Sequence, residues 1–437
     1  MAQKEIGVGL IGCGTVGSGV VKLLTEQAEL YTQRIGSRLT LRKILVRNTQ
    51  TTIERTGVAS SMVTSNAADF FATADMPIVI EVAGGKGVVS QYVRQAITSG
   101  RHVITANKSL LAAEGPELLA LARQHNVSIA FEASCAGGIP IITALNFGLM
   151  ANQIHAIYGI LNGTCNFILT EMVQKGKSYA DALREAQQLG YAEADPTLDV
   201  SGKDAAQKLA ILASLAFGAK VAEDQVLNEG IDTLQLEDIR YAAELGYGVK
   251  LLAIGEKQAN GLSLSVQPCF LHANLPVANV NGSFNAVSVY GHATGHTMYM
   301  GRGAGQLPTA SAVVSDLLNV ASGWYPRAFN DMNLWADRHE PVASVNPDDL
   351  QSRFYIRMTA RDVPGVMAKV STILGDAGIG LSAILQHEAN AGQWVPLVVT
   401  THEARQGSLK QAIARVAQLD VIQGPPVVVR IVDMPQG

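Results

Sequence analysis

The chain has 437 residues, of which 48% are hydrophobic and 16% are charged, and its formal net charge is −4. This length exceeds what one small core needs, so we expect two or three domains, and the composition excludes a disordered or fibrous protein. The slightly acidic charge balance argues against a general nucleic-acid binder.

The cysteines and the first residues bear on the compartment. Cys13, Cys135, Cys165 and Cys269 show no C-x-x-C spacing, which is typical of a reducing environment and offers no zinc framework. The N-terminal segment lacks the succession of basic region, apolar region and cleavage site that marks a secretory signal. Its apolar part is too short and too rich in glycine for a membrane span. We therefore expect a cytoplasmic protein without a membrane partner.

The chain begins with a dinucleotide-binding pattern. An apolar run leads into a glycine-rich turn and then into helical periodicity, and the turn reads Gly12-Cys13-Gly14-Thr15-Val16-Gly17. In this order Gly12 permits a tight turn, Gly14 lets backbone N–H groups approach a pyrophosphate, and Gly17 allows close helix packing. Thr15 and Val16 open the helix whose N-terminus would face the phosphates. A glycine-rich turn without a ligand is the alternative.

The second predicted strand, residues 39–46, bears on the cofactor. It ends at Arg47, where an NAD-selective site usually offers an acid to the ribose hydroxyls. Arg47 instead suits a 2′-phosphate, so we expect NADP(H), with NAD(H) as the alternative. An exposed arginine at the end of a strand would look the same in the sequence.

Strands and helices continue to alternate, which predicts a mostly parallel, doubly wound Rossmann sheet over residues 1–150. Ligands of such sheets lie beyond the carboxyl ends of the strands. Gly84 and Lys108 follow two of these ends, which is the edge of the sheet where a ligand would bind. A solvated loop lysine is the alternative for Lys108. The expected elements are strand 78–82, helix 88–98, strand 102–105, a helix to about residue 125 and strand 127–131.

The next strand end, which starts at Glu132, carries Cys135 between small residues. A reactive cysteine beside a Rossmann sheet would suit a semialdehyde dehydrogenase that forms an acyl-enzyme. This is the alternative enzyme that the sequence leaves open.

The pattern changes near residue 150 and predicts a central α+β domain over residues 151–322. An Asn260-Gly261 pair between two apolar runs indicates a hairpin. The expected elements are strand 154–161, helices 164–175, 179–189 and 202–217, a helical region near 237–246, and strands 249–257, 262–270, 284–290 and 296–300.

Residues 186–208 gather acids and an amine. The helical pattern stops at Gly190, and Pro196 biases its predecessor away from helix before a new helix starts. On that new helix Asp204 and Lys208 are four residues apart, so they share one face. A surface loop with an ordinary helical ion pair is the alternative.

The spacing of Gly190, Asp195-Pro196, Asp199, Gly202, Asp204 and Lys208 resembles the signature of the homoserine dehydrogenase family. The resemblance extends to about residue 320. It implies the reversible, NAD(P)H-dependent reduction of L-aspartate 4-semialdehyde to L-homoserine, on the route to threonine, isoleucine and methionine.

The resemblance also implies roles for the polar residues. Lys208 would donate the proton, because an ammonium group stabilises the alkoxide that forms on the substrate. Asp204 would hold Lys208 in place, and Lys108 would lie near the nicotinamide and the substrate. Glu193 and Asp199 would bind the polar groups of the substrate.

The resemblance also implies an ion site and a second chain segment that joins the Rossmann domain. A Na⁺ or K⁺ ion would be held by the Glu132 carboxylate and the carbonyl groups of Cys135, Gly137 and Ile139, since such ions prefer hard oxygen ligands. Residues 301–322 would complete the Rossmann domain. There Gly305 would lie against the nicotinamide half of the cofactor.

A polar segment, residues 323–351, is predicted to be a linker. Residues 352–437 follow a ferredoxin-like βαββαβ order and, around Asp362-Val-Pro364-Gly365 and Ala377-Gly378-Ile379, resemble an ACT domain. The expected elements are strand 353–359, helix 364–377, strands 379–388 and 394–401, helix 407–418 and strand 425–432.

The ACT resemblance predicts a regulatory amino acid, and threonine is our hypothesis for it. A domain used only for assembly is the alternative, and the family implies a homodimer or homotetramer. A non-catalytic sensor of nucleotides and amino acids is the remaining alternative, although it leaves the acids and the amine of residues 186–208 unexplained.

Overall fold

The computed structural model describes residues 4–387 and 392–435, which divide into two compact units. The first unit holds the residues up to Gly163, together with Asp204–Val226 and Phe284–Val342. The second holds Thr164–Lys203, Leu227–Ser283 and the residues from Ala343 onward. Within the described ranges, no helix is long and apolar enough to cross a membrane.

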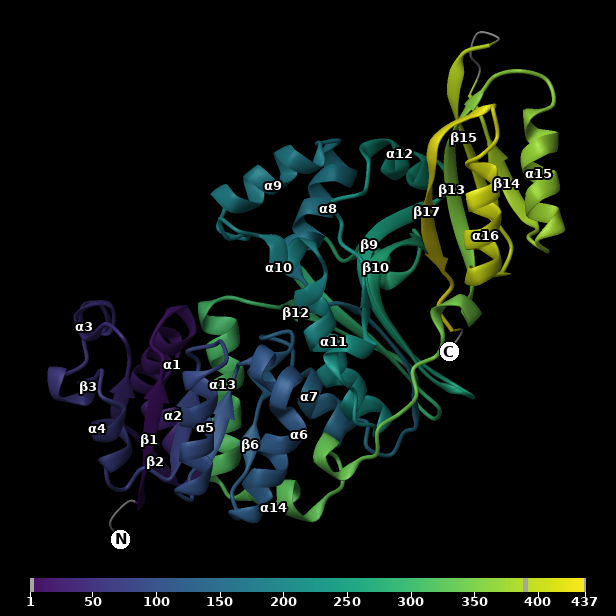
Figure 1. Ribbon diagram of the computed structural model, residues 1–437. Helices are drawn as coiled ribbons and strands as arrows, with labels where there is room; N and C mark the ends of the chain where they lie inside the picture. The colour runs from purple at the N-terminus through teal and green to yellow at the C-terminus, as the bar shows by residue number, and fades with distance from the viewer. Residues whose placement is uncertain (1–3, 388–391, 436–437) are drawn as a thin grey trace. The chain divides into compact units, whose positions relative to one another are not determined.

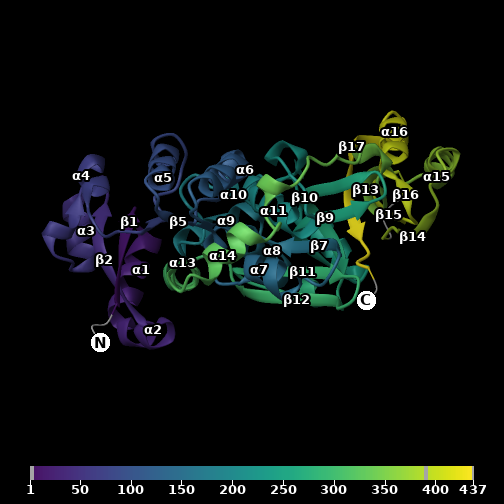
Figure 2. The ribbon, with the colours of Figure 1, turned by 90° about the horizontal axis from the view of Figure 1, so that it is seen from below.

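The first unit contains the predicted doubly wound sheet. Its six strands are parallel and follow the order β3-β2-β1-β4-β5-β6, which places the chain reversal beside β1. Figure 2 shows α1, α2 and α13 on one face of this sheet and α4, α5 and α6 on the other. The strands are β1 (Lys4–Ile11), β2 (Ser37–Leu45), β3 (Val63–Thr64), β4 (Ile78–Glu81), β5 (His102–Thr105) and β6 (Ile129–Ala130).

Helices cover both faces of this sheet with apolar side chains. Three of them begin at asparagines, Asn48, Asn66 and Asn107, whose side chains accept hydrogen bonds from backbone N–H groups of the first turn. The helical segment expected after the glycine turn forms two helices, α1 and α2. The helices are α1 (Thr15–Glu26), α2 (Ala28–Ile35), α3 (Thr49–Thr56), α4 (Ala67–Ala72), α5 (Val88–Thr98) and α6 (Lys108–Gln124).

The rest of the first unit joins segments that are distant in sequence. Strands β7, β11 and β12 pair in antiparallel fashion, and α13 packs against α1 (Figure 1). Residues 306–321 therefore lie against the first helix of the parallel sheet. The elements are α7 (Ile141–Thr143), β7 (Ile154–Ile160), α11 (Lys203–Phe217), β11 (Phe284–Gly291), β12 (Gly295–Arg302), α13 (Gln306–Ala321) and α14 (Trp324–Asp331).

The predicted linker is wrong for its first part. Residues 324–331 form α14, and the Trp335 ring that follows is fully buried. The guanidinium of Arg123 lies 4.2 Å from the centre of the Phe329 ring and 2.6 Å from a carboxylate oxygen of Asp337. Aromatic burial and this ion pair anchor the segment to α6. The polar composition of the segment hid these few anchoring residues.

The second unit has a sheet in the order β9-β10-β17-β13-β15-β14. The predicted hairpin is confirmed, since Gln258 pairs with Gly261 at the turn between β9 and β10. The loop before α11 contains a short helix, α10, that the sequence did not indicate. The elements are α8 (Gly163–Lys175), α9 (Tyr179–Gln188), α10 (Thr197–Val200), β8 (Leu227–Asn228), α12 (Leu236–Glu244), β9 (Tyr247–Gln258) and β10 (Gly261–His272).

The C-terminal part of the second unit has the expected βαββαβ order, and α15 and α16 lie together on one face of its strands (Figure 1). Its apolar core includes Ile356, Val370, Leu374, Val399 and Val416, which are all buried. The last residue of predicted strand 379–388 lies outside the described residues. The elements are β13 (Gln351–Arg361), α15 (Val366–Asp376), β14 (Leu381–Leu385), β15 (Trp394–Thr401), β16 (Ala404–Arg405), α16 (Gln406–Val416) and β17 (Ile422–Val432).

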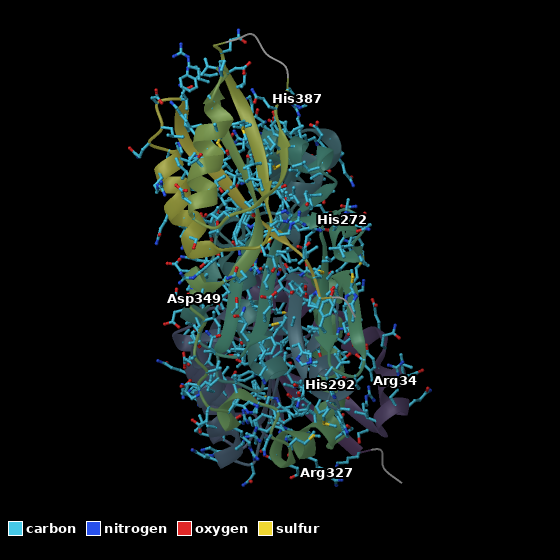
Figure 3. The ribbon with its side chains drawn as sticks, turned by 90° about the vertical axis from the view of Figure 1, so that its right-hand side faces the viewer. Arg34, His272, His292, Arg327, Asp349 and His387 are labelled. Atoms are coloured by element: carbon cyan, nitrogen blue, oxygen red, sulfur yellow. The ribbon has the colours of Figure 1, made fainter. Side chains whose placement is uncertain are left out.

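Helix α12 and the C-terminal strands of the second unit are joined by polar contacts. The Arg357 guanidinium donates two hydrogen bonds to the buried Asp238 carboxylate, at 2.6 and 3.0 Å, and the Tyr355 hydroxyl donates to the same group. The His387 ring, labelled in Figure 3, stacks on Tyr241. These contacts fix the C-terminal strands to the helix within this unit.

Candidate functional site

A pocket of about 230 Å³ lies at the carboxyl ends of the parallel strands of the first unit. Two lysines, Lys108 and Lys208, line it together with small residues. This is the edge of the sheet where ligands bind in doubly wound folds. The other lining residues are Val16, Val82, Gly84, Ala106, Ala133, Ser134, Ala136, Gly137, Gly303, Ala304 and Thr309.

Lys108 is placed by the start of α6. The Asn107 side-chain oxygen accepts from Leu110 N at 3.1 Å, and its amide group donates to the Gly85 carbonyl at 2.6 Å. Asn107 therefore caps the helix and ties it to the loop after β4. As the first residue of this helix, Lys108 is held at the edge of the pocket.

Asp204 joins the two lysines. One of its carboxylate oxygens, Oδ1, lies 3.0 Å from Lys108 Nζ, and the other, Oδ2, lies 2.7 Å from Lys208 Nζ. Asp204 and Lys208 lie on the same face of α11, as their spacing predicted. The structure thus brings together all three residues expected to carry the chemistry.

Asp204 is buried, with 4% of its surface exposed. Burial by itself would raise its pKa, but the charges of Lys208 and Lys108 and the hydrogen bonds from Lys208 and Asn162 outweigh that effect and hold the pKa well below its usual range. Asp204 is consequently ionised at neutral pH. A permanent anion lies between two cationic groups.

Lys208 makes a second fixed contact. Its ammonium group donates to the Leu161 carbonyl at 2.7 Å as well as to Asp204. An ammonium group has three N–H bonds, and the third has no partner among residues 4–387 and 392–435. Because Lys208 lines the pocket, that remaining N–H is available to a ligand.

A second link connects the two lysine-bearing helices. The Ser109 hydroxyl donates to the Gln207 side-chain oxygen at 3.2 Å, and the Gln207 amide donates to Glu223 at 3.1 Å. Ser109 follows Lys108 in the chain, and Gln207 precedes Lys208. The two amines are therefore held in place both by Asp204 and by this link between their helices.

A second pocket, of about 670 Å³, lies over the glycine-rich turn and the end of β2. Gly12 has a φ of +90°, and a Cβ there would meet the Ala83 backbone nitrogen at 2.5 Å, while a Cβ at Gly17 would meet the Gly12 oxygen at 2.4 Å. A Cβ at Gly14 would meet nothing within 4 Å. Gly12 and Gly17 are therefore positions where the backbone packs too closely for a side chain, Gly14 leaves open space, and Thr15 is the first residue of α1.

The charges around the second pocket are all positive. Arg47, Arg55 and Lys86 line it, and no acidic side chain of the described residues does. Arg55 also donates to the Cys13 carbonyl at 3.2 Å, which holds its guanidinium beside the glycine turn. Such a surface favours a bound anion.

Cys135 does not suit an acyl-enzyme. Its thiol is fully buried, and burial raises its pKa to about 12. The Sγ atom lies 3.8 Å from the Lys208 carbonyl. A buried and protonated thiol is a poor nucleophile, so the semialdehyde dehydrogenase that uses Cys135 is disfavoured.

Glu132 is buried at the N-terminus of α7. Its carboxylate accepts hydrogen bonds from Ile142 N, Thr143 N and Thr143 Oγ1 at 2.5 to 2.8 Å. Burial nonetheless raises the pKa of Glu132, and burial raises that of Asp316 beside it. Asp316 accepts from Glu132 N at 2.8 Å and so connects this loop to α13.

The oxygen groups expected around an ion share one loop with Glu132. Among them, the Ile139 carbonyl accepts from Ile141 N at 2.8 Å. A Cβ on Gly137 would meet the Gly303 oxygen at 2.8 Å, so this position requires close backbone packing. A monovalent cation takes carboxylate and carbonyl oxygens as ligands, and the Glu132 carboxylate already accepts three hydrogen bonds from Ile142 and Thr143.

Three other expected site residues do not line the smaller pocket. Glu193 and Asp199 belong to the second unit. Glu193 is exposed, and the Asp199 carbonyl accepts from the Cys165 thiol at 3.2 Å. Gly305 precedes the first residue of α13, whereas Gly303 and Ala304 line the smaller pocket.

Sequence reasoning missed residues that support the site. Glu81 is buried at the end of β4, where its carboxylate accepts from Ala83 N and Gly84 N at 2.9 Å and from the Thr105 hydroxyl at 2.7 Å. The sequence signal for Glu81 was an acidic residue at the end of an apolar strand. The Asn162 side chain, which donates to Asp204 at 2.9 Å, was also missed.

Known proteins resemble this chain over nearly its whole length. Family models described as homoserine dehydrogenase, its NAD binding domain and the ACT domain match residues 140–318, 12–132 and 354–421. A homoserine dehydrogenase of Pseudomonas aeruginosa is 41% identical over 98% of this chain and 99% of its own length.

Solved structures give the same result. A homoserine dehydrogenase from Thiobacillus denitrificans has a TM-score of 0.93 and 41% identity, and the match covers 98% of this chain and 99% of that one. A hyperthermophilic archaeal homoserine dehydrogenase mutant in complex with NADPH has a TM-score of 0.62 and 27% identity, with coverage of 72% and 97%.

Proposed function

Because this chain belongs to the homoserine dehydrogenase family, we propose that Lys208 exchanges a proton with the substrate oxygen as L-aspartate 4-semialdehyde and L-homoserine interconvert. The observation that carries this proposal is the placement of Lys208. Its amine lines the pocket and is held by Asp204 and Leu161. The amine is therefore oriented before any ligand arrives.

The charges suit the reaction. When bound, the dinucleotide supplies or accepts a hydride at its nicotinamide ring. During reduction, negative charge grows on the aldehyde oxygen, which an N–H of Lys208 stabilises and then protonates. Lys108 adds a second positive group to the same pocket, while Asp204 keeps both amines in place. Positive charge thus meets the oxygen where it becomes negative.

Glu193 and Asp199 are proposed to bind the substrate. Both are acids on the segment that precedes α11. The α-ammonium group of the substrate needs an anionic or hydrogen-bonding partner when it leaves water. Replacing either acid with alanine is expected to raise KM for homoserine more than it lowers kcat.

The cofactor is proposed to be NADP(H), with NAD(H) as the weaker alternative. The larger pocket presents Arg47, Arg55 and Lys86 and no acid among its described lining residues. A 2′-phosphate would pair with such cations, whereas the free ribose hydroxyls of NAD(H) are usually met by an acid. Gly12, Gly14 and the start of α1 would receive the pyrophosphate.

Kinetics with both cofactors test this preference. For Arg47→Ser we expect kcat/KM with NADP⁺ to fall by about 10- to 100-fold, since one charge-assisted contact is lost, and kcat/KM with NAD⁺ to change little. Arg38→Ser, which changes an exposed arginine of β2, the strand that ends just before Arg47, is the control. Equal losses with both cofactors would contradict the assignment.

The C-terminal domain is proposed to bind threonine as an inhibitor. The support is the match of residues 354–421 to the ACT family. Threonine added to an assay of homoserine oxidation should lower the rate, and valine at the same concentration should not. If threonine leaves the rate unchanged, the threonine proposal is wrong and an assembly role is favoured. We propose that the enzyme is a homodimer or homotetramer and that it is cytoplasmic.

A Na⁺ or K⁺ ion at Glu132 and the carbonyl groups of Cys135, Gly137 and Ile139 stays a prediction. Its role would be structural. The Tm should be higher in NaCl or KCl than in tetramethylammonium chloride of equal ionic strength. Glu132→Gln should remove that difference, because the ion would lose its anionic ligand.

A further inference from the structure

The end of β7 supplies two consecutive groups to the charged cluster. The Leu161 carbonyl accepts from Lys208 at 2.7 Å, and the Asn162 side-chain amide donates to Asp204 Oδ2 at 2.9 Å. Asn162 and Asp204 are both buried, with 5% and 4% exposure. One short backbone segment therefore holds both members of the ion pair.

The hydrogen bond from Asn162 sets the orientation of the carboxylate. Asp204 Oδ2 receives Asn162 and Lys208, and Oδ1 faces Lys108. A carboxylate on an aspartate rotates easily about its last torsion. With a fixed donor on one oxygen, each lysine keeps its own oxygen.

We propose that Asn162 is a positioning residue for proton transfer: its amide fixes the Asp204 carboxylate so that Lys208 presents its remaining N–H to the substrate. This inference rests on the proposed role of Lys208. Asn162 acts through Asp204 and Lys208. It lies outside the set of residues that line the smaller pocket.

The chemistry of an amide explains why asparagine serves here. Its NH₂ group donates without carrying charge, so it satisfies a lone pair of Asp204 and leaves the balance of one anion and two amines unchanged. A carboxylate at this position would repel Asp204 at neutral pH and could donate only in its protonated form. An apolar side chain would leave the buried carboxylate with one donor fewer.

Two variants of Asn162 separate orientation from folding. For Asn162→Ala we expect kcat to fall about 10- to 100-fold, as is usual when a reacting group is displaced by a fraction of an ångström to an ångström. The Kd for NADPH, measured by fluorescence titration, should stay within about twofold of the wild-type value, since the nucleotide pocket is lined by other residues.

The second variant, Asn162→Asp, changes the pH profile. At neutral pH the new carboxylate cannot donate, so kcat should fall at least as far as in Asn162→Ala. Toward acid pH the new group holds a proton and can donate again. The ratio of variant to wild-type kcat should therefore rise as the pH falls, whereas the ratio for Asn162→Ala should stay flat.

A buried-amide control completes the design. Asn146→Ala changes a buried asparagine, 2% exposed, that does not line the pocket. It should lower the Tm without lowering kcat per folded molecule. A purely structural role for Asn162 would give that same result and would overturn the inference, as would a flat kcat ratio for Asn162→Asp.

The Lys208→Ala variant distinguishes this inference from the proposal beneath it. If Lys208→Ala loses turnover while both Asn162 variants keep the wild-type kcat and pH profile, only the role of Asn162 is wrong. If Lys208→Ala keeps turnover, the proton-transfer role of Lys208 is wrong, and the role of Asn162 is overturned with it.

Discussion

Lys208 in the first unit and Lys250 in the second are both lysines withdrawn from solvent, but their partners differ. Lys208 Nζ lies 2.7 Å from the ionised Asp204 carboxylate and 2.7 Å from a carbonyl. Lys250 is 3% exposed and donates to the Asn166 side-chain oxygen at 3.1 Å and to the Val280 carbonyl. Both of those acceptors are neutral.

The difference shows how a protein decides what a buried amine can do. Lys208 faces a pocket beside an anion, so its charge is matched and one N–H remains for a ligand. The hydrogen bonds of Lys250 go to neutral oxygens, and burial lowers its pKa to about 8. We read Lys208 as functional and Lys250 as structural, and four substitutions test that contrast.

The largest effect is expected for Lys208→Ala. Turnover should fall by about 10³-fold or more, because both the proton donor and the charge that stabilises the alkoxide are removed. Binding of NADPH should persist, as measured by fluorescence titration. Lys22→Ala, at an exposed lysine of α1 that pairs with Glu26, is the control and should leave kcat unchanged.

A smaller loss is expected for Asp204→Asn, about 10²-fold in kcat, since the amines remain but lose the anion that orients them. The free energy of unfolding at pH 7 should also be lower in Asp204→Asn than in the wild type. Because the folded pKa of Asp204 is depressed, its stabilisation exists above the pKa of the unfolded chain and is lost as the pH falls through the folded value. Urea unfolding at several pH values should therefore show wild type and variant converging in acid.

Lys250→Met should affect stability rather than turnover. The pKa of Lys250 falls from 10.5 to about 8 on folding, so between these pH values the unfolded chain binds more protons and wild-type stability rises with pH. Relative to Lys250→Met, the wild type should gain about 1–3 kcal/mol from pH 7.5 to 10.5. Lys257→Met, on the exposed end of the same strand, should show no such trend.

The smallest effect is expected for Cys135→Ser. Its thiol packs near the Lys208 carbonyl but is buried and protonated, so kcat should change by about twofold or less. A loss as large as that of Lys208→Ala, together with phosphate-dependent oxidation of the semialdehyde, would restore the acyl-enzyme alternative.

The contrast between the two lysines was only half visible in the sequence. The spacing of Asp204 and Lys208 on one helix face, and the glycine turn at Gly12, were readable because local periodicity and turn chemistry determine them. Lys250 carried no such signal, since its partners lie in segments that are distant along the chain. The anchoring residues of α14 and of the segment after it were hidden by the polar composition around them, and their partner Arg123 lies on a distant helix.

By itself, the sequence determined most of the order of strands and helices, the dinucleotide turn, the βαββαβ domain and the acid–amine face of α11. These depend on residues within one or two turns of each other. The tertiary structure alone decided that Lys108 reaches Asp204, that β7 delivers Leu161 and Asn162 to the cluster, and that Cys135 is closed to solvent. Such contacts join distant segments through packing, and neither periodicity nor spacing records them.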